Sequence, residues 1–147
     1  MEYSNAHGSI CEYIAEQVPS LWPAQAKVRA EARSVSAEMH SGFMALRHDM
    51  PMEVHAYKPH DGRTAGAEAD IARIASIWQS CRKRFGQEGP FLFGAFSVAD
   101  AMFAPVVWRF LTYAVSLPPD ARAWVDTMAA LLAMQAWRAG AVAEVTE

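Results

Sequence analysis

The sequence is short of cysteine, of long apolar runs and of positive charge, and each shortage excludes a class of protein. Its 147 residues contain two cysteines, Cys11 and Cys81, whose spacing fits neither a metal site nor a disulfide framework. No apolar run approaches the roughly 20 residues of a membrane span, and a net charge of −3 argues against a nucleic-acid partner. The first residues show no secretory signal, so we expect a cytoplasmic protein without a membrane partner.

Signals for β-strands are also missing, because no segment alternates apolar and polar residues between turn residues. Apolar residues instead recur at helical spacing, and proline and glycine fall mostly between the periodic segments. Hydrophobic residues make up 52% of the chain, which is enough to build one core. We therefore predict an all-α bundle of five to six helices, at residues 9–17, 24–49, 67–85 and 97–115, from residue 118 onward and around 133–142.

The segment after Gly94 predicts a buried central helix, because it is apolar on nearly all sides. Ser97 and Asp100 have the spacing of a capping box, in which two side chains bond the orphan amides of the first turn. We expect this cap to matter more than usual, since a buried first turn has no water to bond. Pro105 lies inside the same helix and predicts a kink. Ser9 has the same capping spacing to Glu12 at the first helix.

The order of these features resembles the C-terminal all-helical domain of the cytosolic glutathione S-transferases. The matching pieces run from about Ile10 to Trp137 and read ICEYIAE, LWP, EMHSGFMALR, GPFLFGAFSVADAMFAPV and AMQAW. The segment EMHSGF looks like the ELHKGF segment of bacterial members, and the Ser97–Asp100 pair looks like the internal capping motif of the family. The resemblance implies a five-to-six-helix bundle around a central buried helix.

A complete member of that family also carries an N-terminal thioredoxin-like domain, which activates the glutathione thiol. By resemblance, we assign residues 1–18 to the last helix of such a domain and residues 19–147 to the helical C-terminal domain. An acid–serine pair would precede ICEY and hold glutathione, and this sequence has Ala6 and His7 there. We therefore expect a truncated member that has no catalytic residue and no cofactor and is inactive alone. Glutathione would be its co-substrate if the missing domain is supplied.

The resemblance also implies that residues 24–49 and the central helix form the wall for an apolar electrophile. His40 would lie in the cleft near bound glutathione, where a cation or donor favours the thiolate, or it simply bonds a neighbour on its helix. Phe43 belongs to this wall or to the core, and Arg47 pairs with an acid across a dimer or is solvated. Trp108 and Arg109 are further candidates for substrate binding, with core packing as the alternative for Trp108.

Other chemistry has weaker support in the sequence. The loop HDMPMEVHAYKPH contains His and Met, which suit copper, but Pro51 breaks any rigid frame, so we expect no metal site. Neither cysteine has an activating neighbour, so we expect no covalent role for them. Helices that would cover a thioredoxin-like partner predict an exposed apolar patch near Ile10, Tyr13, Ile14 and the cleft side of the long helix over residues 24–49, with self-association as its natural outcome.

Two functions are consistent with these observations. The first is a glutathione S-transferase-like protein that supplies the hydrophobic-substrate wall and the dimer contact for conjugation of glutathione to small electrophiles. The second is a non-catalytic helical module for assembly or protein interaction. The expected partner is a second copy in a homodimer or a thioredoxin-like domain.

Overall fold

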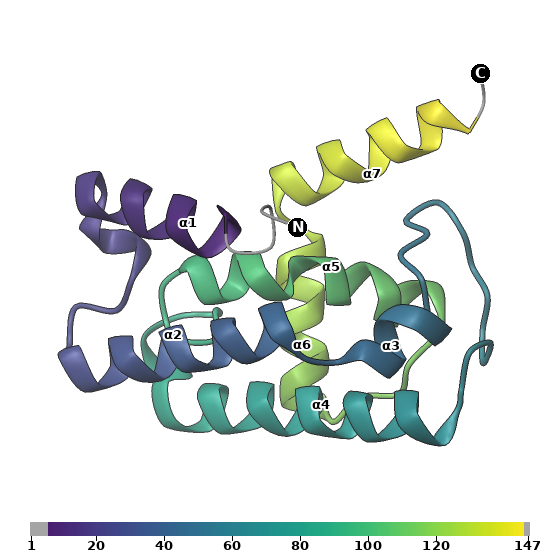
Figure 1. The fold of residues 1–147 in the computed structure, drawn as a ribbon, viewed down its shortest axis with the longest axis horizontal. Coiled ribbons are helices and arrows are strands. Elements are labelled where there is room, and N and C mark those ends of the chain that lie inside the picture. The colour runs from purple at the N-terminus through teal and green to yellow at the C-terminus, as the bar shows by residue number, and fades with distance from the viewer. Residues whose placement is uncertain (1–5, 146–147) are drawn as a thin grey trace.

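The computed structural model describes residues 6–145, with side chains from residue 8 onward, and this part of the chain is all-helical. Seven α-helices and two short 3-10 turns occur within it, and no strand is formed there (Figure 1). The elements are α1 Ala6–Gln17, η1 Pro19–Leu21, α2 Ala26–Ser41, α3 Met44–Asp49, α4 Ala65–Phe85, η2 Gly86–Glu88, α5 Val98–Thr112, α6 Pro119–Ala129 and α7 Leu132–Glu144. The predicted all-α class is confirmed.

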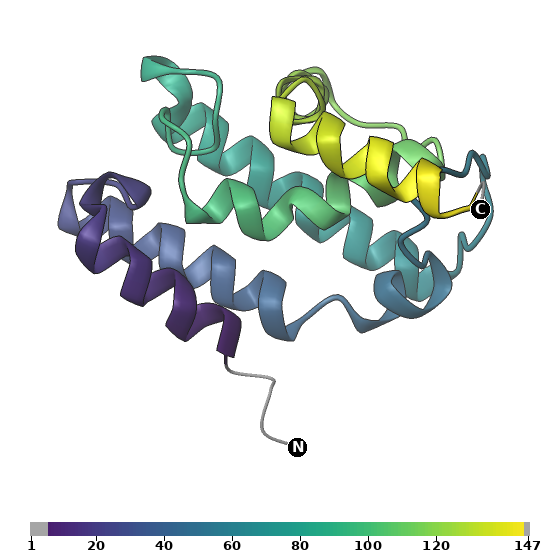
Figure 2. The ribbon, with the colours of Figure 1, turned by 90° about the horizontal axis from the view of Figure 1, so that it is seen from above.

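Helix α5 occupies the middle of the bundle, as its apolar sequence predicted. Helix α2 packs along one side of α5, α6 crosses both α5 and α4, and α3 packs on α4. Helix α1 lies alongside α2 in both views, and α7 continues from α6 and points away from the bundle (Figures 1 and 2). The central position of α5 explains why ten of its residues are buried.

An aromatic cluster joins the helices around α5. Trp78 of α4 is fully buried and packs against Phe103 and Phe110 of α5, with ring centroids 5.8 and 5.3 Å apart. It also packs against Trp124 of α6, at 4.4 Å. Large aromatic rings bury more apolar area than any other side chain, so these four residues contribute much of the stability of the bundle.

Ser97 and Asp100 form the predicted capping box at the start of α5. One carboxylate oxygen of Asp100 accepts hydrogen bonds from the Ser97 amide at 2.9 Å and the Ser97 hydroxyl at 3.1 Å. The other oxygen accepts from the Leu92 amide at 3.0 Å and the Trp124 indole at 2.9 Å. Asp100 is fully buried, so its carboxylate connects α5, α6 and the turn before α5.

The single helix predicted over residues 24–49 is wrong, because the chain breaks between α2 and α3. Gly42 ends α2 in an extended conformation, and Phe43 follows in the left-handed region at φ 61°. A Cβ on Gly42 would lie 2.8 Å from the Glu38 carbonyl oxygen, so the break needs glycine. The Leu46 amide, in the first turn of α3, donates to the Asp70 carboxylate of α4 at 2.9 Å. A tertiary contact therefore stabilises the second helix, and the helix count exceeds the prediction by one.

The predicted start of the first helix is also wrong. Helix α1 begins at Ala6 rather than after Ser9, so Ser9 and Glu12 both lie within the helix and the pair is no cap. The side chain of Glu12 instead pairs with Arg33 of α2. The side chains of Ala6 and His7, where we expected the acid–serine pair of the family, lie outside the described part.

Candidate functional site

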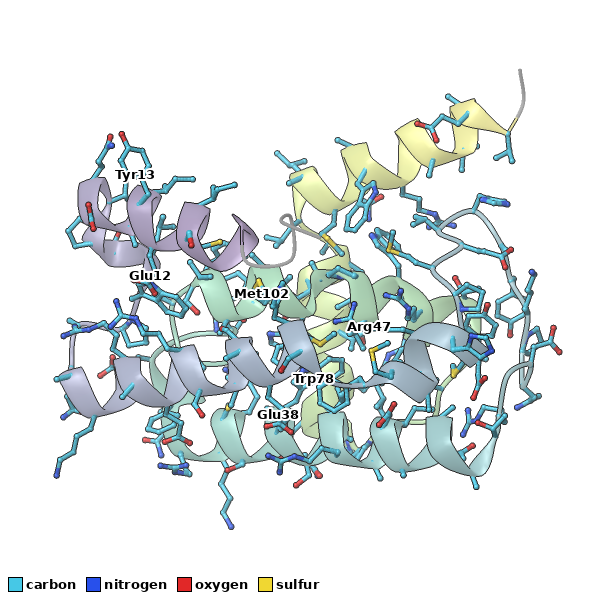
Figure 3. All side chains as sticks on the ribbon, in the orientation of Figure 1. Glu12, Tyr13, Glu38, Arg47, Trp78 and Met102 are labelled. Carbon is cyan, nitrogen blue, oxygen red and sulfur yellow. The ribbon has the colours of Figure 1, made fainter. Side chains whose placement is uncertain are left out.

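Two neighbouring cavities run between α2 and α5 and share His40 and Met102. The first has a volume of about 720 Å³ and is lined on its outer side by α1. The second, of about 380 Å³, lies beside the α2–α3 break and reaches Pro105. We call them the α1 cavity and the Arg47 cavity, and together the α2–α5 groove. Figure 3 shows Glu12, Met102 and Arg47 in this order along it.

Each helix gives the groove a stripe of residues at positions i, i+3, i+4 and i+7, which is one face of an α-helix. The stripe on α2 combines polar and small residues, and the stripe on α5 is apolar. The members are Arg33, Ser36, Ala37 and His40 on α2, and Val98, Ala101, Met102 and Pro105 on α5. Because several of these side chains are short, the two helices leave a space between them. The Ser36 hydroxyl donates its hydrogen bond to the Ala32 carbonyl of the same helix at 2.8 Å, so this proton is not directed into the groove.

An ion pair closes the α1 end of the groove. Arg33 donates to both carboxylate oxygens of Glu12, at 2.8 and 2.6 Å, and its guanidinium lies 5.5 Å from the centroid of the Trp22 ring. The hydrogen bond from Arg33 is the main cause that lowers the pKa of Glu12. This pair joins α1 to α2 and neutralises two of the charges that line the α1 cavity.

Arg47 is held at the other end of the groove by the backbone of α2. Its Nη2 donates to the Met39 carbonyl at 2.5 Å, and its Nε donates to the Gly42 carbonyl at 3.1 Å. Carbonyls at the end of a helix have no partner within it and carry partial negative charge, so a guanidinium there is stabilising. The structure thus gives Arg47 a capping role and also places it in the lining of the Arg47 cavity.

The other predicted binding residues lie behind the groove. Arg109 donates to the Met50 carbonyl at 3.0 Å, where α3 ends, and to the Pro105 carbonyl at 3.4 Å. Burial lowers the pKa of Arg109, and the nearby charge of Arg47 lowers it further. Phe43 and Trp108 are buried in the core. Of the five candidates, only His40 and Arg47 line the groove, and a binding role stays a prediction for all five.

Sequence reasoning missed the residues of α5 that form the wall of the groove. The spacing of Val98, Ala101, Met102 and Pro105 was visible in the sequence, but the whole helix is apolar, so no single face stands out. On α2 the sequence singled out His40 but not Arg33, Ser36 or Ala37, because apolar spacing selects the neighbouring, core-facing stripe. Spacing alone cannot show which two stripes face each other.

The predicted exposed patch on α1 is present. Ile10, Tyr13 and Ile14 are 53%, 64% and 45% exposed. Cys81 is buried, and burial raises its pKa to about 12, so its thiol is unreactive at neutral pH. Among the described residues no group of three potential ligands could hold a metal ion, and no helix is long and apolar enough to cross a membrane.

Comparison with known proteins finds matches to a family model and to solved structures. The family model for the glutathione S-transferase C-terminal domain matches residues 61–143, which is more than half of the chain. The crystal structure of a glutathione transferase homologue from Burkholderia BGR1, with bound glutathione, is similar with a TM-score of 0.59. It is 22% identical in sequence and aligns over 90% of this chain, which spans 64% of that structure. No match was found among curated proteins.

The solved homologue supports the fold alone at this level of identity, and the family match extends from the loop before α4 almost to the end of α7. The matched segment includes α5 with its buried capping box, on which the resemblance in the sequence depended most. The chain therefore belongs to the glutathione S-transferase C-terminal domain family.

Proposed function

We propose that the chain is a glutathione S-transferase-like protein whose α2–α5 groove forms the wall for an apolar electrophile that reacts with glutathione. The observation that carries the proposal is the pair of facing stripes on α2 and α5. They leave a groove whose α5 side is apolar and whose α2 side places His40 where the two cavities meet. Pockets with mainly apolar walls and few polar groups are typical of small-molecule sites.

Conjugation also needs a thiolate, which the groove does not supply by itself. A thiol with a pKa of about 8.5 is only a few per cent ionised at neutral pH, and a nearby donor or cation must lower that value. In our proposal a thioredoxin-like domain supplies this activation, with residues 1–18 as a remnant of that domain and residues 19–147 as the helical domain. The glutathione sulfur then forms the new bond to carbon while the leaving group departs with its electron pair.

A binding experiment tests the groove without requiring catalysis. The ¹⁵N-labelled chain is titrated with S-(2,4-dinitrophenyl)glutathione, the product of conjugation with an aryl halide, and amide shifts are followed by NMR. We expect the largest shifts at Ala37, Ala101 and Met102. Ala101→Trp should fill the groove and abolish these shifts, whereas Ala72→Trp on the exposed face of α4 should leave them unchanged. Shifts confined to other regions, or equal effects of the two variants, would overturn the proposal.

The exposed face of α1 favours the alternative of an assembly module. Ile10, Tyr13 and Ile14 form an apolar surface on one helix, and such surfaces often mark protein contacts. We propose that this face contacts a thioredoxin-like domain or a second copy of the chain. Analytical ultracentrifugation combined with the NMR titration separates the two functions. Concentration-dependent association, without amide shifts at the groove residues, would favour assembly. Amide shifts at the groove residues would favour the transferase role.

A further inference from the structure

The Arg47 cavity has an uneven distribution of charge. Met39, Ala101, Met102 and Pro105 make most of its surface apolar, whereas Arg47 gives it a guanidinium and His40 an imidazole. No carboxylate is among the described residues that line it. A molecule that fills this cavity would therefore be apolar over most of its surface and would meet a cation at one end.

The guanidinium of Arg47 is fixed but not neutralised. Its Nε and Nη2 donate to carbonyls of α2, whereas Nη1 donates no hydrogen bond to any described residue. No described carboxylate pairs with Arg47, although Arg33, Arg73 and Arg84 each pair with a glutamate. Because the backbone already orients the group, a ligand that bonds Nη1 would lose little entropy in ordering the side chain.

A second cation strengthens the positive potential at this end of the groove. The guanidinium of Arg109 is anchored to the Met50 and Pro105 carbonyls and lies near enough to Arg47 to be disfavoured by its charge. The carbonyls at the end of α2 offset roughly half of one charge, so two cations retain a net positive field. An anion in the Arg47 cavity would be attracted to the guanidinium groups of both Arg47 and Arg109.

We propose that the Arg47 cavity is an anion subsite, which binds a small apolar molecule that carries one carboxylate. The carboxylate bonds Arg47 at Nη1, and the apolar part lies along Ala101, Met102 and Pro105. A volume of about 380 Å³ suits one aromatic ring with a short acidic chain. That this molecule is the electrophilic substrate rests on the proposed function; the preference for a carboxylate does not.

The test compares two probes that differ only in charge. Isothermal titration calorimetry at low salt measures 4-phenylbutyrate and its neutral amide on the whole chain. We expect the carboxylate to bind on the order of tenfold more tightly, because charge-assisted bonds to a partly buried, pre-oriented arginine are strong. Arg47→Gln should remove the preference, and Arg122→Gln on the exposed side of α6 should keep it. Equal affinities of acid and amide for the unmodified chain would refute the subsite.

A second variant covers the case in which Arg47→Gln unfolds the α2–α3 break. Ala101 is exposed at the rim of the cavity, so Ala101→Glu adds a competing carboxylate without removing a bond, and Ala101→Gln is its neutral control. We expect the preference to vanish in the first and persist in the second. A preference that survives in Ala101→Glu would also refute the subsite.

Two further readouts identify the carboxylate and separate this inference from the proposed function. If reduced glutathione displaces 4-phenylbutyrate, and does so only when Arg47 is present, the subsite holds a carboxylate of the peptide. If it does not, the subsite belongs to the second substrate. Failure of the proposed function appears as missing NMR shifts with dinitrophenyl-glutathione, whereas failure of the subsite appears as equal affinity for acid and amide.

Discussion

Replacement of Asp100 by Asn tests whether one buried carboxylate connects the three segments around the start of α5. The carboxylate accepts four hydrogen bonds, from the Ser97 amide and hydroxyl, the Leu92 amide and the Trp124 indole. An asparagine keeps one carbonyl oxygen, which can accept two of these bonds, and turns its NH2 group toward the remaining donors.

The magnitude follows from the donors that lose their acceptor. A buried donor left without a partner costs about 1–3 kcal/mol, so two such donors, after some relaxation, should lower the free energy of unfolding by about 2–4 kcal/mol. For a domain of this size, 1 kcal/mol corresponds to a change of about 2–4 °C in Tm. We therefore expect Tm to fall by roughly 4–16 °C.

Urea denaturation followed by circular dichroism at 222 nm measures this loss. Asp126→Asn is the matched control, because Asp126 is exposed and its pair with Arg122 should contribute less than about 1 kcal/mol. The midpoint should shift while the slope with denaturant concentration stays constant, since the surface exposed on unfolding is unchanged. A variant at position 100 as stable as the control would show that the four bonds do not stabilise the fold as argued.

The pH dependence of this loss has a defined sign. Burial raises the pKa of Asp100, and the hydrogen bonds lower it only in part. The folded protein therefore holds the proton more tightly than the unfolded chain, whose Asp ionises near 3.8. Between that value and the raised pKa, the stability of the wild type falls as the pH rises. Because Asn does not titrate, the wild type should exceed Asp100→Asn most at acid pH, and a difference that grows toward neutral pH would contradict this.

Three further predictions concern other parts of the fold. Gly42→Ala should lower the free energy of unfolding by about 1–2 kcal/mol, because the new Cβ meets the Glu38 carbonyl. Gly140→Ala in α7 should raise it by about 0.5–1 kcal/mol, because the new Cβ meets open space. Thermal melts of the two variants should therefore shift in opposite directions. Iodoacetamide should label the half-exposed Cys11 in the folded protein and Cys81 only after unfolding, as mass spectrometry would show. Ile14→Ser should weaken self-association in ultracentrifugation without a change in Tm, and equal association would exclude the α1 patch as the contact.

The sequence was sufficient for features that depend on local spacing. Helical periodicity predicted the all-α class and the buried α5, and the separation of Ser97 and Asp100 predicted the capping box. These features depend on contacts between residues within one or two turns, which the order of residues determines directly. The same local reasoning gave the wrong start for α1, because Ser9 has the spacing of a cap but lies within the helix.

Gly42 marks the break in the sequence, but only the tertiary structure decided that the long helix ends there and where the groove lies. The break between α2 and α3 depends on Asp70, which receives the Leu46 amide from 24 residues away, and on Arg47, which bonds carbonyls of the preceding helix. The groove exists because the stripes of α2 and α5 that line it face each other and include several short side chains. Such arrangements depend on contacts between segments distant in sequence, and a helical pattern gives the face of each helix but not the neighbour that it will meet.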